Sequence, residues 1–206
     1  MMRGYIHLVA AAVTPLALAF LILLADSTRD YVGAAVFGAS LILLYTTSGI
    51  YHVMPLRARV LGVMRRLDHS MIYVLIAGTY TPFALNLLGN GRGIPILSVV
   101  WSLAIAGIVL KATAPNAPRW LGVVSYLAIG WVGLIPAMQL AAALPTVALV
   151  LLVTGGLLYS AAGLIYLFRW PNPFPRVFGF HEVFHSMVVV ASGTFYFVVA
   201  AYVLPY

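Results

Sequence analysis

Two histidines four residues apart, His181 and His185, offer the chemistry that constrains this sequence most. On a helix, positions i and i+4 lie on the same face, one turn apart, so one metal ion can bind both side chains. Zinc binds neutral imidazole readily and favours about four ligands, so the pair predicts half of a zinc site. The surrounding segment is apolar, and ionisable residues inside a membrane usually serve a function. The alternative is two hydrogen-bonded histidines at a helix end.

The other candidate ligands are few. The chain has no cysteine, and its only acidic residues are Asp26, Asp30, Asp68 and Glu182, so a metal must use histidine, carboxylate or water. His52 ends one apolar stretch and shares a helix face with Ser48, four residues earlier. Asp68 opens the next stretch. We expect Ser48, His52 and Asp68 to converge with His181 and His185, and three histidines plus water form the open arrangement of catalytic zinc.

Some of these residues have a simpler explanation. Asp68 follows Arg65 and Arg66, so it can equally cap its helix or pair with an arginine. The hydroxyl of Ser48 can bond to the backbone of its own helix. His69 is turned about 100° from Asp68 on a helix, so we expect it to contact lipid headgroups or backbone and not a metal. We expect His7 at the membrane interface.

The composition is that of an integral membrane protein. Of the 206 residues, 64% are hydrophobic and 7% are charged, whereas a soluble domain has about 25% charged residues. We therefore expect one transmembrane domain over residues 1–206. The net charge of +7 does not indicate a nucleic-acid partner, because the basic residues flank apolar stretches and such residues fix membrane topology.

Seven apolar stretches are long enough to span a membrane, which takes about 20 residues each. They cover residues 4–25, 31–54, 67–88, 93–113, 119–140, 145–168 and 178–204. The pattern predicts an all-α bundle of seven transmembrane helices. We expect Pro15, Pro82 and Pro136 to kink their helices, which neighbouring helices in a membrane tolerate.

The basic residues predict the orientation. In a seven-span chain, nine cations flank the side of the N-terminus, and only Arg29 and Arg92 flank the other side. The positive-inside rule then predicts a cytoplasmic N-terminus and an outside C-terminus, in a multi-pass protein of the cell inner (plasma) membrane. All five histidines and Asp68 fall at the cytoplasmic depth.

Three motifs together resemble the hemolysin III family, which belongs with the progestin and adiponectin receptors. They are Ser48-Gly-Ile-Tyr-His52, Leu67-Asp-His-Ser70 with Ala77-Gly-Thr-Tyr-Thr-Pro82, and Phe178-Gly-Phe-His-Glu-Val-Phe-His185. The resemblance implies zinc held at the positions of His52, His181 and His185, and Asp68 in contact with the water that completes the zinc coordination. Ser48 matches the family serine. His7 matches a first-span histidine, but Arg3 replaces the asparagine before it, and the associated glutamate is missing.

Wider relatives of this family include ceramidase-like hydrolases. We therefore expect a zinc-dependent hydrolase of lipid-like amides or esters, with Asp68 and Ser48 as catalytic residues and a membrane lipid or fatty acyl substrate. The alternative is a non-enzymatic lipid or stress sensor, or a cytolytic protein, with structural zinc. The histidine pair also brackets Glu182 as in metalloproteases. Receptor members need no glutamate there, which argues against Glu182 as the base.

Overall fold

The computed structural model describes residues 2–205, apart from the side chain of Asn90. Helices make up nearly all of this part, and its only strand-like feature is an isolated bridge between Phe174 and Phe178. The helices are α1 (Met2–Leu23), α2 (Thr28–Val53), α3 (Ala58–Leu87), α4 (Gly89–Thr113), α5 (Arg119–Gly130), η1 (Trp131–Leu134), α6 (Ala137–Ala143), α7 (Thr146–Phe168), α8 (Phe180–Val198) and η2 (Val199–Val203). The predicted all-α membrane bundle is confirmed.

The predicted fifth span is broken. Six helices of the described chain are long and apolar enough to cross a membrane, and α5–η1 with α6 makes a seventh only as a pair bent by 54°. The break falls at Gly130, Gly133 and Pro136, where proline offers no N–H to continue the helix. The hydroxyl of Tyr80 on α3 accepts from the Gly133 N–H at 2.6 Å and contacts the Gly130 carbonyl, so the freed backbone groups keep partners.

Helix α3 begins nine residues before the predicted span, at Ala58. Charged residues interrupt the apolar pattern there, but the segment is rich in strong helix formers such as arginine, leucine and methionine. Asp68 consequently lies ten positions after Ala58, and the first turn of α3 contains no acidic residue. The explanation of Asp68 as a helix cap is therefore wrong.

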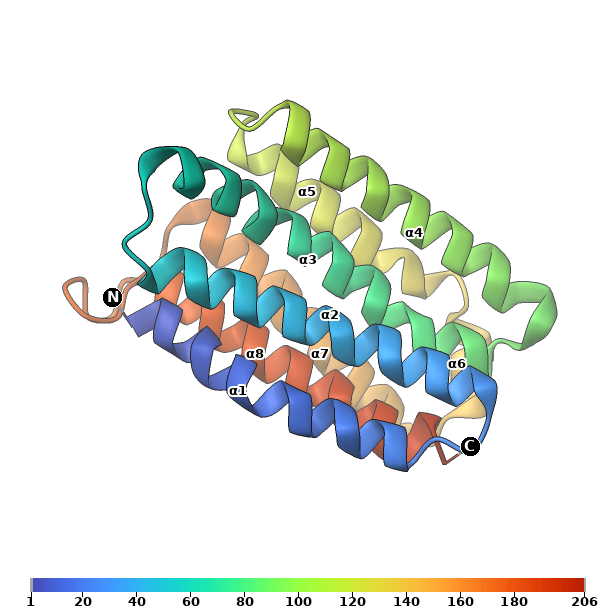
Figure 1. The fold of residues 1–206 in the computed structure, drawn as a ribbon. Coiled ribbons are helices and arrows are strands. Elements are labelled where there is room, and N and C mark those ends of the chain that lie inside the picture. Colours follow the sequence, from blue (N-terminus) through green and yellow to red (C-terminus); the bar gives the residue numbers. More distant parts are fainter. Residues whose placement is uncertain (1, 206) are drawn as a thin grey trace.

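The helices form a closed ring. Helix α2 packs between α1 and α3, and α8 packs against both α1 and α7. The loops α2–α3, α4–α5 and α7–α8 lie at the same end of the bundle as the start of α1, and the chain finishes at the other end (Figure 1). The histidine motifs of α2 and α8, which are far apart in the sequence, therefore meet at the end where the chain starts.

Candidate metal centre

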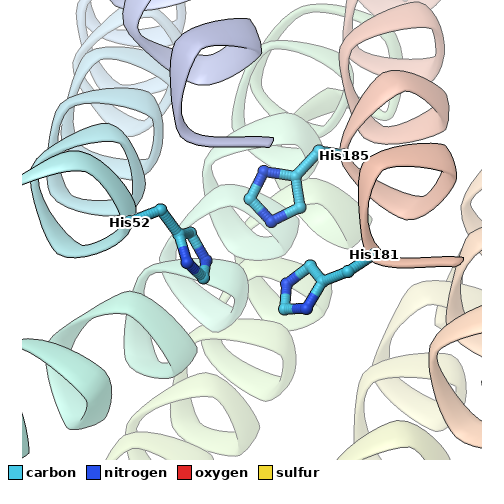
Figure 2. Close-up of side chains that lie close together, drawn as sticks. All are labelled: His52, His181 and His185. Carbon is cyan, nitrogen blue, oxygen red and sulfur yellow. The ribbon is translucent and has the colours of Figure 1, made fainter. Parts of the chain in front are cut away.

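Three imidazoles converge at this end of the bundle. His52 lies in the last turn of α2, and His181 and His185 lie in the first two turns of α8. One nitrogen from each ring falls within 4.8 Å of the others, so the three residues could hold a metal ion. Figure 2 shows the rings from the two helices turned toward a common space.

The donor set fits a metal ion. His185 is 1% exposed, and its Nδ1 and the Nε2 of His52 are buried without a hydrogen-bond partner. Burying a polar atom unpaired costs free energy that a metal bond would recover. Tetrahedral zinc with bonds of about 2.0–2.1 Å would hold its ligand nitrogens about 3.3 Å apart. The present spacing of up to 4.8 Å is wider by at most about 1.5 Å, which side-chain rotations can close.

Asp68 and Ser48 lie beside the imidazoles. The Oδ2 atom of Asp68 is 3.9 Å from Nε2 of His52. Ser48 is 2% exposed and lies one helical turn before His52 on α2. Both residues line a cavity that His181 and His185 also line. All five predicted site residues therefore gather at one place, from α2, α3 and α8.

Arg3 enters the site although the sequence motifs gave it no role. Its Nε donates to Nδ1 of His52 at 3.3 Å, and its guanidinium lies 3.9 Å from the Glu182 carboxylate. Glu182 also accepts from the Gly179 N–H at 3.0 Å, which caps the start of α8. Helix α1 is thereby tied to α2 and α8. In the sequence, the feature that could have predicted this role is a lone arginine in the first turn of an apolar helix.

His7 lies inside the bundle, so its prediction as an interfacial residue is wrong. It is 2% exposed, its ring stacks on His185 with centroids 3.9 Å apart, and neither ring nitrogen has a hydrogen-bond partner. The reason is the close approach of α1 to α2 at Gly4, where an added Cβ would lie 2.9 Å from the Cβ of His52. His69 lies outside the three-histidine group, as predicted.

The fold and this cluster define a multi-pass helical membrane protein with a buried histidine site that could hold a metal. The chain belongs to the haemolysin-III related family, whose model matches residues 1–196. It is 38% identical over 189 residues to the Hemolysin-3 homolog of Bacillus subtilis (strain 168), covering 90% of this chain and 85% of that protein. It is 35% identical over 175 residues to Hemolysin-3 of Bacillus cereus, covering 84% and 76%.

A human relative is more distant. The chain is 24% identical over 187 residues to the monocyte to macrophage differentiation factor of Homo sapiens, covering 87% of this chain and 74% of that protein. The predicted membership of the hemolysin III family is therefore confirmed.

Proposed function

We propose that the protein is a zinc-dependent hydrolase of lipid-like amides or esters, acting at the cytoplasmic leaflet of the inner (plasma) membrane. The observation that carries the proposal is the position of the buried polar cluster on a largely apolar cavity of about 600 Å³. A cavity of this size, with few convergent polar groups, is typical of small-molecule sites. Its apolar walls suit an acyl chain, whose linkage would then lie at the polar end.

His52, His181 and His185 would hold the zinc ion. When bound, zinc supplies a Lewis acid that polarises a carbonyl and lowers the pKa of water. Three neutral nitrogens leave room for a further ligand, as catalytic zinc sites require. Arg3 and Glu182 contact His52 and the start of α8 without lining the cavity.

Asp68 is the proposed general base. Its carboxylate would take a proton from the attacking water and return it to the leaving amine or alkoxide, which is the ordinary cycle of acid–base catalysis. Ser48 would hold that carboxyl in place through its hydroxyl. Glu182 is less suited to this role, because its carboxylate caps α8 and pairs with Arg3 and does not line the cavity. This geometry disfavours the protease alternative.

The test is lipid hydrolysis by the purified protein. Ceramides, N-acyl amines and phospholipids are supplied in turn, and released fatty acid is measured. We expect Asp68→Asn to retain metal and fold but to lose turnover by about 100-fold or more, as for other lost acid–base groups. Glu182→Gln is the matched carboxylate control and should retain turnover.

Two results would contradict the proposal. Turnover that persists in Asp68→Asn and disappears in Glu182→Gln would move the base to Glu182. Release of no fatty acid from any lipid by metal-loaded wild-type protein would favour the non-enzymatic sensor or cytolytic alternative.

A further inference from the structure

Three cations line the cavity at the end of the bundle that holds the imidazoles, and we call this end the mouth. Arg65 on α3, Lys111 on α4 and Arg119 on α5 all belong to its lining, although they come from three different helices. His69 also lines the cavity, and its ring lies 6.5 Å from the Tyr166 ring that Arg119 contacts. His69 directly follows Asp68, so the cations gather close to the polar cluster.

These cations have no acidic partner within residues 2–205. In the described part of the chain, Glu182 lies against Arg3 and Asp68 lies against His52. Arg65 donates to the Pro115 carbonyl at 3.3 Å, and Arg119 donates to the Tyr166 carbonyl at 3.2 Å. The Lys111 ammonium lies 5.8 Å from the centroid of the Tyr126 ring. Carbonyls and aromatic faces orient these groups but supply no opposite formal charge.

The mouth borders the metal centre directly. The guanidinium of Arg119 lies 4.8 Å from the centroid of the Tyr166 ring, and that ring lies 5.7 Å from the ring of His181. Arg65 is one helical turn before Asp68 on α3, so the cations lie outside the carboxylate along the cavity. Between Arg119 and His181, only the Tyr166 ring separates the mouth from the imidazoles along this path.

Membrane topology does not explain this placement. The positive-inside rule needs basic residues in the loops but does not require them to face a cavity. At the same end of the bundle, Arg57, Arg59, Arg66 and Arg169 do not line the cavity. The Lys111 side chain packs against α5. A Cβ added to Gly122 would lie 2.5 Å from the Nζ atom of Lys111.

We infer that Arg65, Lys111 and Arg119 bind the anionic headgroup of an acyl lipid, a phosphate or carboxylate, while the acyl chain fills the cavity. This inference rests on the proposed function and narrows its substrate class to acidic acyl lipids. Guanidinium and ammonium groups bind such anions through charge-assisted hydrogen bonds. The acyl linkage of the lipid would then lie between the headgroup at the mouth and the chain in the apolar part, beside Asp68 and the imidazoles.

The test compares two lipids with the same acyl chain and the same ester. Oleoyl lysophosphatidate carries a phosphate, and monooleoylglycerol is its neutral counterpart. Binding is measured to Asp68→Asn protein in nanodiscs of neutral lipid, so that turnover does not consume the probe. We expect lysophosphatidate to bind at least about tenfold more tightly than monooleoylglycerol. Lys111→Gln should lower the affinity for lysophosphatidate about tenfold, as for loss of one charge-assisted hydrogen bond. Arg66→Gln is the control and should keep the preference.

Several results would overturn the inference. One such result is equal affinity for the two lipids. Another is a loss of lysophosphatidate affinity in Arg66→Gln as large as that in Lys111→Gln, because such a loss would indicate a general attraction to the basic surface. Arg119→Lys keeps the positive charge and checks folding, so it should retain most of the preference. Inorganic phosphate at millimolar concentration should not displace the lipid, and displacement would identify a site for free phosphate.

Equal hydrolysis of both esters would overturn this inference alone, whereas selective binding without hydrolysis would overturn the proposed hydrolase.

Discussion

The two ring nitrogens of His52 have different surroundings. Nδ1 accepts a hydrogen bond from Arg3, and Nε2 is buried near Asp68 without a hydrogen-bond partner. A neutral imidazole that accepts at Nδ1 carries its proton on Nε2. A metal on Nε2 would take the place of that proton and turn Nδ1 into a donor. Metal binding and the Arg3 contact are therefore in competition at this ring.

Removing Arg3 should consequently strengthen metal binding. Arg3→Met keeps an unbranched apolar stem but removes both the competing donor and a positive charge that repels a cation. We expect zinc affinity to rise, and competition with a fluorescent chelator will measure it. Arg176→Met removes a cation that makes no contact with His52 and should leave affinity unchanged. Weaker binding in Arg3→Met would show that Arg3 positions His52 for the metal instead.

The imidazoles themselves should decide metal content. His181→Ala removes one of three nitrogens, so its cost should exceed the roughly 10- to 100-fold in affinity that outer-shell substitutions typically cost. Elemental analysis of purified protein should find about one zinc per chain in the wild type and a strong reduction in the variant. His69→Ala is the matched control, since His69 lies at the same end but outside the group. Equal zinc in wild type and in a triple alanine variant would refute the site.

At the scale of elements, the site depends on how closely α1, α2 and α3 approach one another. Helices in a membrane gain little from the hydrophobic effect and associate through close packing at small residues. Gly4 brings α1 onto α2 beside His52. Gly33 lets α2 approach α3 closely, because an added Cβ there would lie 2.9 Å from the Cα of Pro82. A backbone atom cannot move aside as a flexible side chain can.

Gly33→Ala should therefore destabilise the bundle, by about 1–3 kcal/mol as for other overpacked sites. Gly193→Ala on α8 is the control, because a Cβ there meets nothing within 4 Å. Alanine is the better helix former, so the control should be neutral or slightly stabilising. Thermal unfolding of both variants in the same detergent will measure the difference, and equal midpoints would contradict the packing argument.

At the scale of the whole molecule, the charges define two different ends. The loops that carry most of the basic residues lie with the imidazole cluster, and the chain finishes at the opposite end (Figure 1). The positive-inside rule predicts that the basic end lies in the cytoplasm. The cavity mouth would then open toward the cytoplasmic leaflet, where the proposed lipid substrate would enter.

A reporter that is active only in the cytoplasm checks this orientation. Fused after Tyr206 it should be silent, because the end of η2 lies opposite the basic loops (Figure 1). Inserted in the α2–α3 loop, between Pro55 and Arg57, the same reporter should be active. Strong activity after Tyr206 together with silence in the loop would reverse the orientation and move the site to the outer side.

The sequence by itself determined the membrane class and the apolar segments, and it placed His52, His181 and His185 at the ends of those segments. These properties follow from local hydrophobicity and from helical spacing, which require no knowledge of which helices are neighbours. Five site residues were identified on that basis: Ser48, His52, Asp68, His181 and His185. The same spacing predicted that these residues converge, and the resemblance to the family implied which of them would hold zinc and which would contact its water.

Only the tertiary structure decided what lies around those residues. His7 and Arg3 join the site because α1 packs against both α2 and α8, and a long-range contact of that kind leaves no periodic trace in one segment. The break at Gly130–Pro136 is stable because Tyr80, on another helix, supplies partners for the freed backbone groups. The cationic mouth likewise exists because three helices that are separate in sequence end beside one cavity.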